Sequence, residues 1–225
     1  MVFLTDGAPR DRNLWSSGLP CSREEYAAIR REEATKAFAI AGIDRSNVSF
    51  LQAVDQEAIE MASDLVKRLR GLLEKFTPDL VITHPYEGGH PDHDAAAFVA
   101  ALAIRGESPS PELVEMTSYH ARSWQCVTGE FLGSDAGNFV RELSIQDRER
   151  KLTMMECYAS QRDVLQSFPK DCERFRKSPV YDFTSPPHEG KLWYEIMGWH
   201  TTGEHWRSLA AKFLKESLVQ SVACD

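Results

Sequence analysis

The sequence predicts an α/β fold in which a mostly parallel sheet carries helices on both faces. In the first half of the chain, three short apolar segments alternate with three longer segments of helical periodicity. Alternation of this kind requires crossover connections, and crossovers favour parallel strands. In chain order, the segments are 1–5, 22–42, 48–51, 56–75, 78–83 and 94–102.

The helical segments have recognisable ends and faces. Ser22 followed three residues later by Glu25 is a capping-box pattern, and Gly42 is a natural stop for the same helix. The second helical segment repeats its apolar residues along roughly one face. These residues are Ile59, Leu65, Leu69 and Leu72.

The second half of the chain is less regular. Its pattern predicts strands at 112–119 and 192–197, helices at 145–165 and 204–218, and an ordered loop at 168–190. Aromatic residues between 193 and 206 suit core packing better than a ligand site, because large aromatic side chains dominate protein interiors.

Composition limits the class of protein. The 225 residues are 42% hydrophobic and contain no linker-like stretch, which indicates a single domain over 1–225. The net charge of -8 argues against nucleic acid or an anionic membrane as the main partner and favours a small polar molecule. The five cysteines form no Cys-x-x-Cys pair, and we find neither a signal peptide nor an 18-residue apolar span. We expect a soluble cytoplasmic protein, and the oligomeric state is left open.

The turn at 83–94 carries the densest chemistry in the chain. It contains three histidines and three carboxylates between the apolar strand at 78–83 and the helix at 94–102. Ligands of open α/β sheets bind outside the carboxyl ends of the strands, so the position agrees with a site. The six residues are His84, Glu87, His90, Asp92, His93 and Asp94.

Two of these histidines have a spacing that suits a metal. His90 and His93 converge if the first lies in the loop and the second enters the helix, and Asp92 between them is placed to orient an imidazole. A His-x-x-His pair alone is weak evidence. Polar residues that merely cap a helix after a Gly-Gly turn explain the same pattern.

The segment His-Pro-Asp-His at 90–93, with Thr-His-Pro at 83–85, resembles the second metal-site motif of the PIG-L/LmbE-like deacetylases. These zinc-dependent enzymes remove N-acetyl groups from amino sugars. Residues 3–7 look like the family's second strand and loop, and 30–34 like its following helix. Ser160 and Gln161 are similar to a Ser-Gln pair in a later helix of the family.

The resemblance implies a Rossmann-like three-layer sandwich, a Zn²⁺ cofactor and an amino-sugar or glycoconjugate substrate. It implies that His93 is a zinc ligand, that His90 stabilises the oxyanion of the tetrahedral intermediate, and that Asp92 supports the ligands. The acyl group is left open, since the sequence does not distinguish acetyl from a longer chain.

Four further residues are candidates for substrate contact. His84 and Tyr86 lie in the same loop and are expected to contact sugar hydroxyls. Arg30 reaches the site from its helix in this interpretation, and Asp6 follows the first strand. A local structural role is the alternative for His84 and Tyr86, and an exposed solvating role is the alternative for Arg30.

One family feature is missing. The family's first motif, Ala-His-Pro-Asp-Asp-Glu, supplies a histidine ligand, an aspartate ligand and the general base, and it occurs nowhere in this sequence. The family's first strand and helix are missing with it. We expect a shortened version of a longer deacetylase, so residues 1–225 alone should show little or no activity.

Two alternatives to a shortened enzyme stay open. In one, the chain is a catalytically dead α/β module that binds a glycan. In the second, Asp6, Asp11 or Glu87 complete a rebuilt metal site. A nucleotide-binding module is disfavoured, because the sequence has neither Gly-x-Gly-x-x-Gly nor a P-loop.

Overall fold

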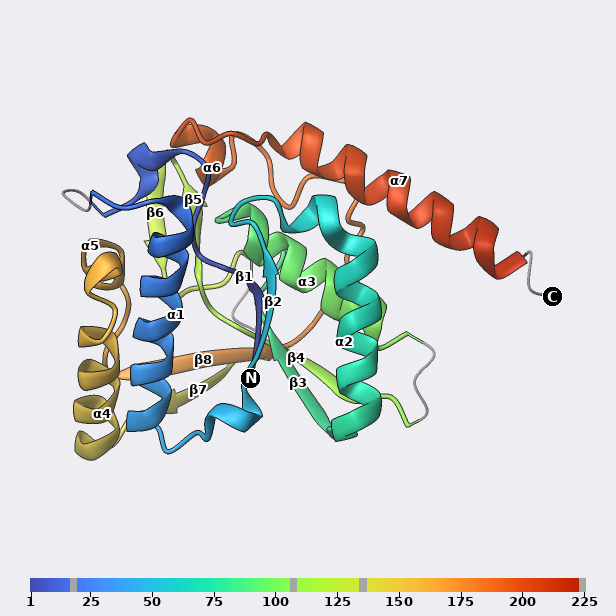
Figure 1. Cartoon of the computed structure of the whole chain (residues 1–225). Coiled ribbons are helices and arrows are strands. Elements are labelled where there is room, and N and C mark those ends of the chain that lie inside the picture. Colours follow the sequence, from blue (N-terminus) through green and yellow to red (C-terminus); the bar gives the residue numbers. More distant parts are fainter. Residues whose placement is uncertain (17–19, 106–108, 134–136, 223–225) are drawn as a thin grey trace. The chain divides into compact units, whose positions relative to one another are not determined.

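The computed structural model describes residues 1–16, 20–105, 109–133 and 137–222 (Figure 1). The chain forms two compact units, each made of two stretches of sequence. The first unit comprises Met1–Asp55 and Val140–Glu173, and the second comprises Gln56–Phe139 and Arg174–Asp225. The expectation of a single domain over 1–225 stays a prediction, and each unit is described by itself.

The first unit is built on two parallel strands. β1 (Val2–Thr5) pairs with β2 (Ser49–Ala53) in the register Val2↔Ser49 and Phe3↔Phe50. α1 (Arg23–Ile40) makes the crossover between them and begins with the predicted capping box, in which Ser22 Oγ accepts from the Glu25 N–H. The predicted strand, helix, strand order is therefore confirmed for this segment.

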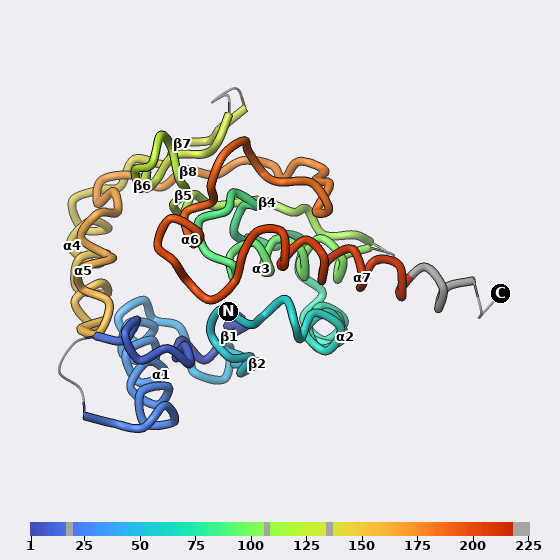
Figure 2. Tube along the Cα trace, turned by 90° about the horizontal axis from the view of Figure 1, so that it is seen from above, coloured from blue at the N-terminus to red at the C-terminus, as the bar shows by residue number. Residues whose placement is uncertain are grey.

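α1 packs against α4 (Ile145–Glu156), and the two helices lie side by side in Figures 1 and 2. A short turn, η4 (Ala159–Gln161), and α5 (Arg162–Leu165) follow α4. The predicted helix at 145–165 is therefore divided into three pieces, α4, η4 and α5.

Part of the apolar packing of the first unit is aromatic: Trp15 stacks on Tyr26 with ring centroids 4.8 Å apart.

The second unit contains the parallel pair β3 (Leu80–Thr83) and β4 (Glu112–Met116), paired residue for residue from Leu80↔Glu112 to Thr83↔Glu115. β8 (Cys172–Lys177) runs antiparallel to β4, and β7 (Phe139–Glu142) completes the order β3-β4-β8-β7. A separate hairpin is made by β5 (Tyr119–Arg122) and β6 (Gln125–Thr128).

Helices of the second unit pack on one another through an apolar core. α3 (Pro91–Ala103) contacts α2 (Ala62–Phe76) and the turn η3 (Ala58–Met61), and α7 (Gly203–Val222) also contacts α2 and η3. Phe98 of α3 and Trp206 of α7 are both fully buried. Within the described residues, no helix combines the length and apolar composition needed to span a bilayer.

The predicted α/β fold with parallel strand pairs is confirmed, and three local predictions are wrong. Segment 112–119 forms parts of two strands rather than one, and 168–190 contains β8 rather than only loop. Segment 192–197 forms the short helix α6 (Trp193–Ile196) instead of a strand. The carboxylate of Glu195 explains this helix, because it accepts from the N–H groups of Leu192 and Gly203 at 2.9 and 2.8 Å.

Candidate functional site

The histidine loop, residues 84–90 of the second unit, leaves β3 and enters α3. Asp94 Oδ1 closes it by accepting from the N–H groups of Glu87 and Gly88 at 3.1 and 3.0 Å. Gly89 has no space for a side chain, since a Cβ there would lie 1.7 Å from the Tyr119 carbonyl oxygen. These contacts hold the loop against the start of β5.

His90 is the N-cap of α3, and this position fixes its ring. Its Nδ1 accepts from the Asp92 N–H at 3.1 Å. A ring nitrogen that accepts carries no proton, so a neutral His90 carries its proton on Nε2. The edge-to-face contact with Trp199, at 4.9 Å between centroids, packs the ring from one side. His90 therefore offers an N–H donor at Nε2.

His93 lies in the first turn of α3, next to two other imidazoles. Its Nδ1 is 3.0 Å from Ser118 Oγ, and its ring lies 4.0 Å from His84 and 5.1 Å from His90 between centroids. Burial holds the pKa of His93 well below its usual value, and burial followed by the proximity of His90 lowers the pKa of His84 to about 4. All three histidines thus meet at one end of α3, with His93 and His84 neutral at pH 7.

Neutral imidazoles are the ligands that zinc prefers, and the arrangement around His93 suits one such bond. If Nδ1 donates to Ser118 Oγ, the hydroxyl orients the ring, and the Nε2 lone pair would be available to a metal. His84 does not share that ion, because rings stacked with planes 8° apart direct their in-plane lone pairs side by side. Of the stacked pair, only His93 therefore suits a zinc ion, and His90 and Asp92 also offer ligand atoms that lie within 4.8 Å of each other. A catalytic zinc takes three protein ligands.

Asp92 contacts the backbone of a neighbouring turn. Its carboxylate accepts from the N–H groups of Gln56 and Ala58 at 2.7 and 3.1 Å, which ties the start of α3 to the entrance of η3. Its Oδ2 lies 3.8 Å from His90 Nδ1, too far for a hydrogen bond. The contacts favour a backbone-organising role for Asp92 over the predicted support of an imidazole.

Tyr86 belongs to the core of the second unit. It is 3% exposed, its hydroxyl donates to the Ser185 carbonyl oxygen at 2.9 Å, and its ring stacks on Trp206 at 5.3 Å. Burial raises the pKa of its phenol. This geometry favours packing over the predicted contact with a sugar, whereas His84 stays half-buried in the loop.

Arg30 and Asp6 lie in the first unit, and both engage protein groups. The Arg30 guanidinium contacts Glu33 Oε2 and Ser160 Oγ, each at 3.1 Å, and also the Gly7 carbonyl oxygen. Glu33 in turn accepts from the Ser160 N–H and hydroxyl at 2.8 and 2.6 Å. The two recognised segments, 30–34 and Ser160–Gln161, therefore come together as a structural cluster.

Asp6 organises the loops at the end of β1. Its Oδ1 accepts from the N–H groups of Ala8 and Asp55 at 3.0 and 3.3 Å, and its Oδ2 pairs with Arg23. These bonds fix the exits of β1 and β2 within the first unit. They favour a structural role over the predicted substrate contact.

The sequence interpretation missed a buried charge network behind the histidine loop. Arg176 of β8 contacts Glu115 Oε2 at 2.8 Å and Glu87 Oε1 at 3.1 Å, and its guanidinium lies 4.1 Å from the centroid of the Phe131 ring. Tyr181 donates to Glu115 Oε2 at 2.9 Å. Because Glu87 belongs to the histidine loop, the network anchors that loop to the sheet.

Comparison with known families agrees with these features. Residues 1–104 match the family model described as PIG-L: GlcNAc-PI de-N-acetylase. The first 104 residues are thus similar to the PIG-L family. The match includes the histidine loop and the start of α3, and it confirms the family that the motifs indicated. No curated protein sequence matches the chain.

Solved structures share the fold. A triple mutant of the deacetylase Orf2 of the teicoplanin biosynthetic pathway has a TM-score of 0.56 and 18% identity, covering 81% of this chain and 85% of that one. The deacetylase Dbv21, which acts on A40926 pseudoaglycone, has a TM-score of 0.55 and 17% identity over 80% and 85% of the two chains. The zinc-inhibited form of teicoplanin deacetylase Orf2 has a TM-score of 0.52 and 13% identity over 80% and 88%.

Proposed function

We propose that this protein is a hydrolase that removes the N-acetyl group from an amino sugar or glycoconjugate. The family match over 1–104 and the fold shared with the teicoplanin-pathway and A40926 pseudoaglycone deacetylases support this proposal. The observation that carries it is the His90 ring, whose Nδ1 is held by the Asp92 N–H so that Nε2 presents a proton. Amide hydrolysis needs such a donor where negative charge develops.

His90 and His93 have separate roles in this mechanism. His90 Nε2–H donates to the oxyanion that forms when water adds to the acetyl carbonyl. The C–N bond then breaks, a proton from the added water passes to the nitrogen, and acetate and the free amine separate. His93, with Nδ1 facing Ser118 Oγ, offers Nε2 to a divalent metal. Zinc bound there would supply a water of lowered pKa and polarise the carbonyl.

Among the remaining candidates, we keep substrate contact for His84. Its imidazole stacks on His93 and is neutral at pH 7, so it suits a sugar hydroxyl without competing for a proton. Tyr86, Arg30 and Asp6 bind protein groups instead. Asp92 supports the site by holding the start of η3 beside the start of α3.

A glycan-binding protein without hydrolytic activity is the second candidate. The sequence contains no His-Pro-Asp-Asp, and the stacked His84 and His93 do not converge on one ion. The sugar site would then persist without the metal ligands and the general base that hydrolysis requires.

Two measurements on the full chain test the proposal. Bound zinc per chain is determined by elemental analysis, and acetate release is followed with N-acetylglucosamine and an N-acetylated glycoconjugate. Near-stoichiometric zinc with acetate release supports the hydrolase. Sugar binding without zinc or acetate supports the glycan-binding candidate and rejects the hydrolase for this chain.

The variant His90→Asn separates chemistry from folding. Asparagine is a preferred N-cap and accepts from the Asp92 N–H, but it removes the Nε2 donor. If the wild-type chain releases acetate, we expect kcat to fall about 100-fold in this variant, with the melting temperature little changed. A His90→Asn variant with unchanged kcat would contradict the role of His90.

A further inference from the structure

The β5–β6 hairpin of the second unit has an unusual turn. Arg122 pairs with Gln125, so Ser123 and Trp124 form a two-residue loop, and both have positive φ, at 52° and 69°. Turns of this kind favour Asn-Gly, because a side chain at positive φ is strained. Here a tryptophan takes the place of glycine and is 68% exposed. The backbone strain and the exposure together indicate a functional role for the indole at this position.

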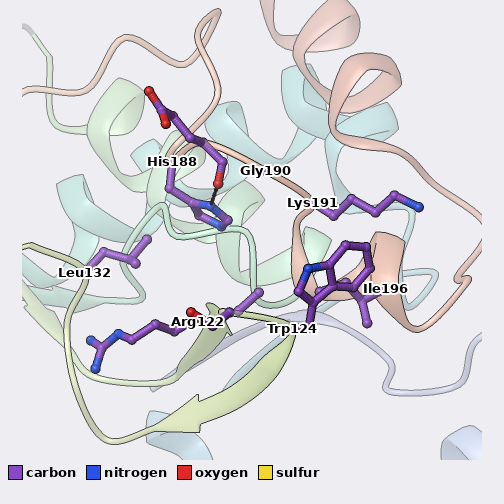
Figure 3. Close-up of a pocket in the computed structure, with 10 residues that line it drawn as sticks. Arg122, Trp124, Leu132, His188, Gly190, Lys191 and Ile196 are labelled. Carbon is purple, nitrogen blue, oxygen red and sulfur yellow. Dashed lines mark hydrogen bonds between the residues drawn. The ribbon is translucent and has the colours of Figure 1, made fainter.

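The indole borders a pocket of about 360 Å³ (Figure 3). The Lys191 ammonium lies 5.7 Å from the centroid of the Trp124 ring, and Figure 3 shows both on one side of the pocket, with His188 and Leu132 on the other. The lining is therefore an exposed indole that carries the Lys191 ammonium over its ring and is surrounded by further polar groups. The polar lining residues are Arg122, Ser123, His188, Glu189 and Lys191.

His188 contributes an acceptor to this lining. Its Nδ1 lies 2.7 Å from the Glu189 carbonyl oxygen, which only accepts, so Nδ1 carries the proton. In a neutral ring, Nε2 is then an acceptor. It is buried and has no hydrogen-bond partner among the described residues. A ligand hydroxyl matches this atom.

Both walls of the pocket continue into the histidine loop. Ser118 and Tyr119, at the start of β5, contact His93, and β5 then runs to the turn at the pocket. Three residue steps at ~3.3 Å each place the end of β5 roughly 10 Å from its start. On the other side, Leu192, which follows the lining residue Lys191, packs on Gly88, where an added Cβ would lie 2.6 Å from Leu192 Cδ2.

We propose that this pocket is a subsite for a second sugar ring of the substrate, stacked on the Trp124 indole and hydrogen-bonded by the surrounding polar groups. The proposal rests on the proposed function, since it assumes that a first sugar reacts beside His90 and His93. A pyranose presents C–H groups on one face, which suit the indole, and hydroxyls at its rim, which suit His188 and Lys191. A separation of roughly 10 Å requires more than one sugar ring, and the substrate is therefore a disaccharide or longer glycan.

Binding measurements on the chelator-treated full chain test this subsite without any hydrolysis. We expect the β-linked disaccharide of N-acetylglucosamine to bind about tenfold more tightly than the monosaccharide, and Trp124→Gly to abolish that preference. Glycine suits the positive φ, so the melting temperature of Trp124→Gly should not fall. Trp124→Phe keeps an aromatic face and should keep most of the preference.

Val180→Ala is the matched control, because Val180 is 98% exposed and does not line the pocket. Equal affinities of the wild-type chain for both sugars, or a preference that survives Trp124→Gly, would overturn the subsite. Acetate release is measured separately with zinc. A disaccharide preference without acetate release keeps the subsite and rejects the hydrolase.

Discussion

Arginine joins distant segments in both units, but with different burial. In the first unit, Arg30 and Glu33 connect α1 to Ser160, with side chains 20% and 9% exposed. In the second unit, Arg176 lies between Glu87 and Glu115, which are 3% and 0% exposed. The first cluster includes segments by which the family was recognised, whereas the second gave no signal in the sequence. The cluster that is easier to recognise is thus the less buried of the two.

The largest effect is expected from Arg176→Met. This variant leaves Glu87 and Glu115 buried without their cation, and breaking a buried pair in this way costs about 3–5 kcal/mol. The free energy of unfolding, measured by urea denaturation, checks the loss. A decrease below ~1 kcal/mol, the usual limit for an exposed pair, would show that the network is solvated.

The double variant Arg176→Met with Glu87→Gln sharpens the comparison. In the wild-type chain the Leu132 N–H lies 2.7 Å from Glu87 Oε1. Glutamine at this position keeps an acceptor for that N–H but carries no charge. We expect it to recover about 1 kcal/mol or more of the unfolding free energy lost in Arg176→Met. Additive losses in this double-mutant cycle would mean that the charge of Glu87 is not what makes Arg176 necessary.

Glu33→Gln in the first unit should have a smaller effect, about 1–2 kcal/mol. The amide still accepts from Ser160 at one oxygen but loses the second acceptor and the ion pair with Arg30. Urea denaturation with the control Glu32→Gln, an exposed neighbour on α1, checks this value. Equal losses of unfolding free energy in Glu33→Gln and Glu32→Gln would show that the contacts of Glu33 with Arg30 and Ser160 do not stabilise the fold.

The smallest effect is expected from Arg68→Ala, which removes an exposed pair on α2 in the same unit as Arg176. Arg68 lies 3.3 Å from Asp64, and their side chains are 39% and 52% exposed. Such a pair contributes about 0.3–0.5 kcal/mol, and the contribution should decline further as salt is added. An effect as large as that of Arg176→Met would show that burial is not what separates the clusters.

The sequence predicted the histidine loop because its information is local. His90 in the loop and His93 in the helix follow from four consecutive residues and the strand before them. The contact of Arg176 with Glu87 was not predictable, because the two residues are 89 positions apart in the sequence and meet only through the pairing of β8 with β4. Long-range strand pairing leaves no periodic pattern in one sequence.

Two local errors have a similar origin. Segment 192–197 is apolar or aromatic except for Glu195, a composition that also suits a short strand. Glu195 accepts from two N–H groups and stabilises a helical turn instead. The hairpin at 119–128 was not predicted in full, because Ser-Trp is not a recognised turn pair. In both places, one residue makes the local structure differ from what the pattern of its neighbours predicts: Glu195 in α6 and Trp124 in the hairpin turn.

The bond from the Asp92 N–H to His90 Nδ1 has one more consequence. Helix formation itself selects the ring tautomer, so the donor is preorganised before any substrate arrives and needs no proton rearrangement between turnovers. Changes that fray the first turn of α3 would then alter the reaction rate without touching the substrate. The stability of this turn and the rate of the reaction would vary together across variants.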